Sequence, residues 1–166
     1  MANLINRFGP VEDRWQIVEI LSDEFVPAQA KRSIFPVELW RELQPQFKAA
    51  AVTPGILLDA DQDLEEIADL IPELPLIAVN FTAFANGTGF STGAMLRERY
   101  GFSGELRATG TVILDQMSYL RRCGFSEAEV TEEAEIAAAV EKFSDGVVSY
   151  QGSINQQRTP FKRRFG

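Results

Sequence analysis

Residues 86–125 concentrate the side chains that could carry chemistry in this sequence of 166 residues. The stretch is rich in glycine and contains the only cysteine, Cys123. It also contains several arginines, although the net charge of the chain is −8. These are Arg97, Arg99, Arg107, Arg121 and Arg122. Polar side chains at this density exceed what a packed core needs, so we expect a polar site here.

The loop at residues 86–91 is the first candidate for ligand binding. It follows an apolar run and precedes a helical pattern, and Gly87 and Gly89 would let backbone N–H groups approach a ligand. A helix N-terminus favours an anion. The loop lacks the full G-x-G-x-x-G pattern and is not a Walker motif. A tight turn with Ser91 as the helix N-cap explains the same residues, so both interpretations stay open.

Arg107 is the second candidate, because a guanidinium group offers a planar fork for a carboxylate, a phosphate or a sulfate-like oxyanion. Glu105 lies two residues earlier on the same face of a predicted strand, and Asp115 lies near the start of the helix that follows. Either carboxylate is a candidate acid or base. The alternative is a structural ion pair between this arginine and Glu105, Asp115 or Glu98.

The absence of histidine restricts the chemistry most. It removes the usual Ser-His-Asp and Cys-His systems and, with a single cysteine, the usual zinc sites, so we expect no metal. Chemistry must therefore use carboxylates, arginine, lysine, tyrosine, one thiol or a borrowed cofactor. Cys123 fits a small buried hydrophobe, and the alternative is a redox thiol beside Arg121 and Arg122.

The charge and the apolar pattern restrict the class of protein. A net charge of −8 argues against nucleic-acid binding, which uses basic surfaces. The N-terminus lacks a signal-peptide pattern, and no apolar run approaches about 18 residues. We therefore expect a cytoplasmic protein without a membrane span.

Alternating strand and helix patterns from residue 55 onward predict how the candidate residues are positioned. Short apolar runs predict strands at residues 56–58, 76–79, 106–108, 129–131 and 147–150. Helical periodicity predicts helices at residues 63–71, 92–100, 112–122 and 134–143. The alternation predicts an α/β fold with a mainly parallel sheet of about five strands, as an open sheet or half of a TIM-type barrel. In both arrangements ligands bind at the carboxyl ends of the strands.

We expect a single domain with three parts. Residues 1–54 are expected to form an irregular N-terminal cap, in which a short helix at residues 37–43 ends before Pro45. Residues 55–151 form the βα body. Residues 152–166 form a basic tail that carries +4 and no acid, so the rest of the chain carries −12, the difference between −8 and +4. The tail either binds an acidic partner or a neighbouring subunit, or is a solvated end.

Residues 96–125, LRERYGFSGELRATGTVILDQMSYLRRCGF, resemble the signature of the DUF934 family of bacterial proteins. The resemblance covers most of residues 35–151. Members of that family are often labelled as oxidoreductases of sulfite reduction, and their genes typically neighbour a sirohaem-dependent sulfite or nitrite reductase. At residues 86–88 and 110–112 this chain reads Asn-Gly-Thr and Gly-Thr-Val, where the family usually reads Asp-Gly-Arg and Gly-Asp-Val. These differences remove two acids and one arginine, which indicates a divergent branch.

The motifs and the residues shared with the family together define the candidate site. The candidate ligand-binding residues are Asn86, Gly87, Gly89, Ser91, Arg97, Arg107, Gly110 and Arg122. The candidate catalytic groups are Asp115 and Glu105.

The resemblance implies a role in assimilatory sulfur metabolism, and two hypotheses follow. In the first, the chain is an accessory protein of the reductase, because a chain with no histidine and one cysteine cannot ligate sirohaem or a four-iron cluster alone. No cofactor is then expected on this chain, and a second copy of it is a further expected partner. In the second, it is a small enzyme or sensor that binds an oxyanion or a phosphorylated ligand through Arg107 and the 86–91 loop. A third alternative is a domain whose arginine–carboxylate network serves only folding.

Overall fold

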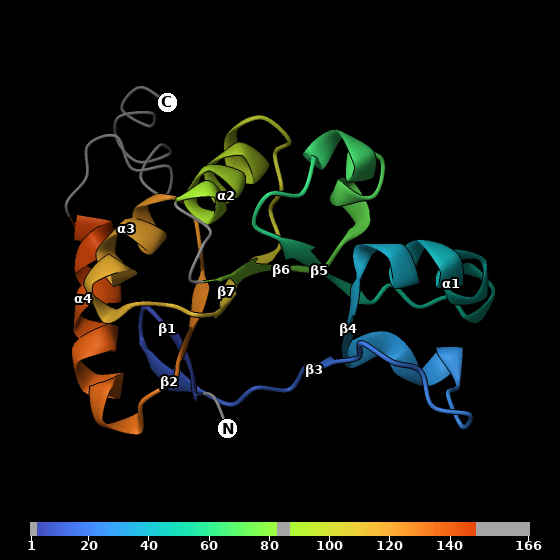
Figure 1. Cartoon of the computed structure of the whole chain (residues 1–166), viewed down its shortest axis with the longest axis horizontal. Coiled ribbons are helices and arrows are strands. Elements are labelled where there is room, and N and C mark those ends of the chain that lie inside the picture. Colours follow the sequence, from blue (N-terminus) through green and yellow to red (C-terminus); the bar gives the residue numbers. More distant parts are fainter. Residues whose placement is uncertain (1–2, 83–86, 149–166) are drawn as a thin grey trace.

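The computed structural model describes residues 3–82 and 87–148 of the chain. The strands are β1 (Asn3–Asn6), β2 (Gly9–Val11), β3 (Gln16–Ile17), β4 (Ser33–Pro36), β5 (Gly55–Asp59), β6 (Leu76–Phe81), β7 (Glu105–Gly110) and β8 (Glu127–Val130). The α-helices are α1 (Val37–Ala50), α2 (Thr88–Glu98), α3 (Met117–Arg122) and α4 (Ile136–Val148). Short 3-10 helices are η1 (Pro27–Arg32), η2 (Leu64–Ile67), η3 (Ile71–Glu73), η4 (Leu114–Gln116) and η5 (Glu133–Glu135). Figure 1 shows their arrangement.

The strands form one eight-stranded sheet in the order β2-β1-β8-β7-β6-β5-β4-β3. From β3 to β8 each strand pairs in parallel with the next strand in the chain. At one edge β1 pairs antiparallel with β8, and β2 pairs antiparallel with β1. The structure confirms the α/β class and the mainly parallel sheet, but the described residues supply eight strands rather than about five.

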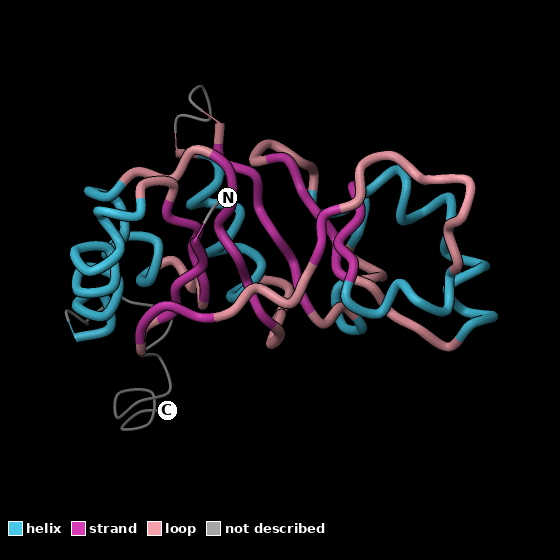
Figure 2. The backbone as a smooth tube through the Cα atoms, turned by 90° about the horizontal axis from the view of Figure 1, so that it is seen from below, coloured by secondary structure: helices cyan, strands magenta, loops and turns pink. Residues whose placement is uncertain are grey.

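The sheet curls as half of a barrel, because its parallel strands are added in one direction (Figure 2). A right-handed crossover repeated in one direction places every connecting helix on the same face. The helices therefore cover one face of the sheet, which we call the helix-covered face. The opposite face carries no helix among the described residues and is called the helix-free face.

Alternate residues of each strand enter the main core on the helix-covered face. Ile77 and Val79 of β6 and Leu106 of β7 are fully buried there, together with apolar residues from the helices. Residues of the opposite parity, such as Leu76 and Ala78, form a smaller apolar cluster on the helix-free face. One face of β6 therefore packs in the main core, and its other face packs in the smaller cluster on the helix-free face.

The segment between β2 and β3 runs along the helix-free face, below the strands in Figure 1. Trp15 packs against the small apolar cluster there, and Asp13 reaches β7. Residues 3–36 also supply β1 to β4, so the N-terminal section is part of the sheet rather than an irregular cap. Strands of two to four residues are too short for an apolar period to predict them.

Helix α1 continues through Pro45, whereas the sequence predicts a helix that ends before it. A proline inside a helix removes one backbone hydrogen bond and costs about 3 kcal/mol. Burial offsets this cost, because Trp40, Leu43 and Phe47 lie at helical spacing on both sides of the proline and are all buried. Ala51 then ends the helix in the left-handed conformation, with φ of 57°.

Residues 63–71 do not form the predicted α-helix, and the 3-10 helices η2 and η3 lie in this part of the chain instead. Asp63 caps the first of them as its position predicts, since its side chain accepts a hydrogen bond from the Glu65 N–H group at 3.0 Å. Pro72 disfavours the α conformation at Ile71, so an α-helix could not continue beyond this residue.

The predicted strand at residues 147–150 is wrong, because α4 extends to Val148 and residues 149–150 lie outside the described ranges. Periodicity alone cannot assign a short apolar run such as Val147-Val148 to a strand or a helix. The alanine-rich segment before it favours a helix, which continues across Gly146. The other predicted strands coincide with β5 to β8, with ends that differ by at most two residues.

The helices are short. Helix α1 has 14 residues and is therefore about 21 Å long. A bilayer core needs about 20 apolar residues. No helix within residues 3–82 and 87–148 combines the length and apolar character that crossing a membrane requires.

Helix α2 packs closely against the sheet through two glycines that lie one helical turn apart. A Cβ atom at Gly89 would lie 2.5 Å from the Phe81 ring, and one at Gly93 would lie 2.3 Å from the Phe125 ring. The two rings contact each other edge to face, with centroids 5.6 Å apart. These contacts set the position of α2 relative to β6 and to the turn before β8.

Gly93→Ala is expected to destabilise the protein, although alanine favours a helix over glycine by up to about 1 kcal/mol. The added methyl group would clash with the fully buried Phe125 ring, and overpacking of this kind costs roughly 1–3 kcal/mol. Urea denaturation should therefore show a net loss of stability. Ser91→Ala, at an exposed position of the same helix, is the control and should change stability by less than about 0.5 kcal/mol. A stability gain for G93A would contradict the close packing.

Candidate functional site

Alternate residues of β7 and β8 place a row of polar side chains on the helix-free face. Arg107 and Thr109 of β7 have this orientation, since Leu106 and Ala108 enter the main core. Glu127 of β8 lies directly opposite Arg107 in the parallel register. The polar row is therefore a consequence of strand geometry.

Arg107 is the centre of this row and is held by two carboxylates. Its Nε atom donates a hydrogen bond to Glu127 Oε1 at 3.1 Å, and its Nη1 atom donates to Asp13 Oδ1 at 3.1 Å. The Arg107 side chain is 3% exposed, so both ion pairs are largely shielded from water. Its Nη2 atom is buried and makes no hydrogen bond to any described residue. The guanidinium group thus ties the segment between β2 and β3 to the sheet.

The carboxyl group of Glu127 has a raised pKa because it is buried. The charge and hydrogen bond of Arg107 act in the opposite direction, but they do not cancel the effect of burial. The charges of Glu105 and Asp13 raise the pKa further. Burial therefore outweighs the attraction of Arg107 at the Glu127 carboxyl group.

The two candidate acid–base residues lie at opposite ends of β7. Glu105 begins the strand, and its Oε2 atom accepts a hydrogen bond from Ser126 Oγ at 2.9 Å. Asp115 follows the strand, in η4, and is exposed. The length of β7 from Glu105 to Gly110, about 17 Å, lies between them. The two carboxylates therefore do not share a site.

Gly110 has a structural role at the carboxyl end of β7. Its φ is 87°, and a Cβ atom there would lie 2.4 Å from the Phe81 carbonyl oxygen, so only glycine fits. The Gly110 N–H group donates to Glu129 Oε1 at 3.1 Å, and Thr109 Oγ1 donates to the same oxygen. This N–H group therefore already has a hydrogen-bond acceptor within the protein.

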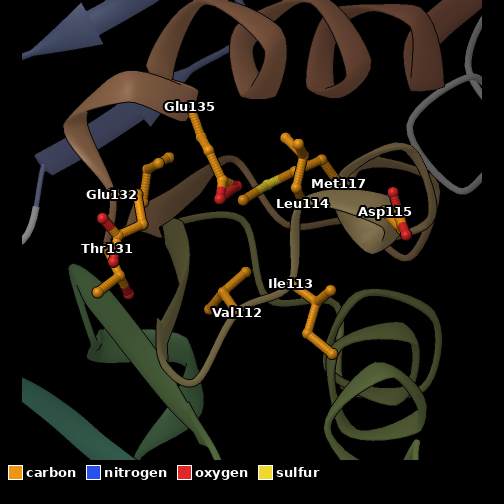
Figure 3. A pocket seen from close by; sticks show the side chains of 9 residues that line it. Val112, Ile113, Leu114, Asp115, Met117, Thr131, Glu132 and Glu135 are labelled. Carbon is orange, nitrogen blue, oxygen red and sulfur yellow. The ribbon is translucent and has the colours of Figure 1, made fainter.

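A cavity of about 370 Å³ lies beyond the carboxyl ends of β7 and β8. Residues 112–117 supply most of its apolar lining, and Glu132 and Glu135 come from the segment after β8. Figure 3 shows Glu135 pointing toward Met117, whereas Asp115 lies on the other side and points away. Ligands of α/β proteins bind at this position in the fold.

The predicted helix at residues 112–122 begins two residues later than expected, beside this cavity. Val112 lines the cavity, and Ile113 has an extended backbone, with φ of −92° and ψ of 134°. The helical part begins at Leu114 with η4 and continues as α3. Both displaced residues are β-branched, which lowers their helix propensity.

A second cavity, of about 450 Å³, lies at the opposite ends of the strands. It is lined by residues that precede β3 to β6, among them Trp15, Lys31 and Arg32. Arg32 lies over the Trp15 ring, 5.5 Å from its centroid. The amino ends of parallel strands usually serve stability rather than ligand binding.

Arg97 binds backbone carbonyl groups. Its Nε atom donates to the Gly124 oxygen at 2.8 Å, and its Nη1 atom donates to the oxygens of Phe102 and Gly104, both at 2.9 Å. The guanidinium group also lies over the Phe102 ring, 5.4 Å from its centroid. Arg97 therefore ties α2 to the loop before β7 and to the turn before β8.

The remaining candidates of α3 are on the helix-covered side of the sheet, because this helix packs into the main core. Arg122 is exposed and lies over the Tyr119 ring, 5.5 Å from its centroid. Arg121 is buried, and burial lowers its pKa to about 10. Burial also raises the pKa of the Cys123 thiol, which disfavours the reactive thiolate.

The predicted loop at residues 86–91 is largely helical. Asn86 lies outside the described residues, and Gly87 precedes α2 with φ of 86°. The helix begins at Thr88, not near residue 92, so Ser91 lies inside it and is not the N-cap. Gly89 is buried against the sheet. The buried ring of Phe90 belongs to the apolar face of α2, which accounts for the earlier helix start.

The structure does not bring the candidate residues together. Arg107 lies on the helix-free face, Arg97 on the helix-covered side, and Asp115 at the cavity beyond the strand ends. Sequence reasoning missed Glu127, which faces Arg107 only when the strand is placed at residues 127–130. It also missed Asp13, which lies 94 positions from Arg107 and has no local signal.

One family model matches the chain. It is described as "Bacterial protein of unknown function (DUF934)" and matches residues 55–161, which is more than half of the chain. The matched range contains β5 to α4, including Arg97, Arg107 and Asp115. No curated protein matches the chain.

Arg97→Ala is expected to lower the free energy of unfolding by roughly 2–4 kcal/mol, because three carbonyl groups lose a charged donor. Arg99→Ala, at the end of the same helix, is the control. Arg99 forms an ion pair with Glu65 and is 64% exposed, so its loss should cost less than about 1 kcal/mol. Urea denaturation of both variants measures the difference, and equal losses would rule out the role assigned to Arg97.

Glu127→Gln is expected to change how stability depends on pH. Because the folded-state pKa of Glu127 is raised, its contribution is largest below the unfolded-state value, near 4.5, and declines as pH rises through the folded-state value. The stability of the wild type relative to E127Q should therefore fall as pH increases above about 4.5. Urea denaturation between pH 4 and pH 8 measures this difference. Glu12→Gln, at a side chain that is 77% exposed, is the control. A relative stability that rises with pH would show that the Arg107 charge outweighs burial.

Proposed function

The chain belongs to the DUF934 family, and on this basis we propose that it is an accessory protein of assimilatory sulfur metabolism. It acts by contact with a sirohaem-dependent sulfite or nitrite reductase in the cytoplasm, and it carries no cofactor of its own. The resemblance to proteins of sulfite reduction supports the pathway. The placement of the arginines supports contact rather than chemistry as the mode of action.

The observation that carries the proposal is the engagement of the arginines by the protein itself. Arg107 binds two carboxylates, and Arg97 binds three backbone carbonyl groups. A site that acts on sulfite or nitrite needs several donors that converge on one open position. An accessory protein needs a folded surface, and both arginines contribute to folding.

The helix-free face is also unfavourable for a small anion. Asp13 and Glu127 contact the guanidinium group of Arg107, so an oxyanion at its remaining donor would lie near two carboxylates. A like charge at about 4 Å costs about 4 kcal/mol at an effective dielectric constant near 20. The alternative function, an oxyanion-binding enzyme or sensor that uses Arg107 and the 86–91 loop, therefore has less support.

Deletion of the gene in the native bacterium tests the proposal. Growth is expected to slow with sulfate as the sole sulfur source and to stay normal on cysteine. The tagged full-length protein is expected to co-purify with the reductase from sulfate-grown cells, and plasmid expression of the wild type should restore growth. Unchanged growth on sulfate together with no co-purification would refute the accessory role.

Thermal-shift measurements separate the alternative function from the accessory role. An accessory protein should show no shift with sulfite, nitrite, sulfate or phosphate. A true ligand at 100 times its Kd would add roughly 2.7 kcal/mol of stability. A shift in the wild type that is lost in Arg107→Lys, which keeps the charge but not the planar fork, would support the oxyanion hypothesis instead.

A further inference from the structure

The cavity beyond β7 and β8 carries negative charge that the described residues do not balance. Asp115, Glu132 and Glu135 line it, and none of their carboxylates forms an ion pair or a hydrogen bond with another described residue. Met117 and Val130 lie buried in its wall, and Ile113 at its rim is 51% exposed. A suitable occupant is therefore positively charged and also apolar.

The chain itself contains a segment with these properties outside the described residues. Residues 152–166 carry Arg158, Lys162, Arg163 and Arg164 and no acid. The same segment contains Phe161 and Phe165. The rest of the chain carries −12, the difference between −8 for the whole and +4 for the segment. The charge of the segment is thus complementary to that of the cavity.

The length of the chain allows this segment to reach the cavity. Helix α4 begins directly after Glu135 and has 13 residues, so its far end lies about 20 Å from the cavity. Residues 149–158 can span up to about 33 Å when extended. Arg158 and every residue after it can therefore return along α4 to the acidic residues of the cavity.

We propose that residues 152–166 dock in the cavity at the carboxyl ends of β7 and β8 of the same chain. The basic side chains pair with Glu132 and Glu135, and the phenylalanine rings cover the apolar wall beside Ile113. Exposed ion pairs are individually weak, but attachment to the same chain gives the segment an effective concentration of about millimolar. Docking is therefore intramolecular and weakened by salt. It does not depend on the proposed function.

Amide hydrogen exchange of the full-length protein, read by mass spectrometry, tests the proposal. Glu132→Lys/Glu135→Lys is expected to speed exchange in residues 152–166 by at least about fivefold. Glu19→Lys/Glu24→Lys has the same net charge, and both of its positions are exposed and lie near β3 at the other edge of the sheet. This control should leave exchange in residues 152–166 unchanged.

A charge swap keeps the test specific. Adding Arg163→Glu/Arg164→Glu to the E132K/E135K variant should restore slow exchange, because the sign of every new pair is again favourable. Exchange in residues 152–166 that is equally fast in the wild type and in E132K/E135K would overturn the proposal. Equal acceleration by the Glu19 and Glu24 control would also overturn it, because the attraction would then be nonspecific. Protection that depends on protein concentration would assign the contact to a second copy and overturn docking within one chain.

Discussion

The right-handedness of the crossovers between parallel strands determines the layout of this protein. Because β3 to β8 are added in one direction, the connecting helices lie on one face, and the sheet curls around the other. The face without helices would expose Leu76 and Ala78 to water. The segment between β2 and β3 crosses this face, and Trp15 packs against the apolar cluster that contains both residues. Because right-handed βα units leave one face of the sheet uncovered, the N-terminal segment is needed to cover it.

The Arg107 ion pairs position this segment. A buried ion pair contributes little net stability, because desolvation of the two charges offsets most of their attraction. Its effect is on specificity, since few placements of residues 12–15 bring a carboxylate to the buried guanidinium group. Glu127 completes the arrangement from the neighbouring strand. We therefore interpret the polar row of β7 and β8 as a feature that selects one arrangement of the fold.

Short-range patterns predict β5 and β6 well, because strands buried on both faces are continuous apolar runs. They do not predict the extent of α1, since the burial of Phe47 beyond Pro45 depends on the rest of the core. Arg107 stands out in the sequence as a charge within an apolar strand. A guanidinium group has the same chemistry whether it binds a ligand or forms an ion pair, so only the position of its partner shows which role Arg107 has. That partner, Asp13, is 94 positions away and beyond any local pattern.

The pairing of β1 with β8 links the start of the chain to a strand near its end. The N-terminus leaves the ribosome first and β1 can pair with β2 early, yet β1 gains its second partner, β8, only after residue 130 has been made. Until then Ile5, which is fully buried in the finished protein, lacks the neighbours that cover it. Contacts between such distant residues form slowly, because a long loop must close first. During most of its synthesis the nascent protein therefore presents a strand with one unpaired edge and an uncovered apolar side chain, and exposed apolar surface of this kind is what chaperones protect.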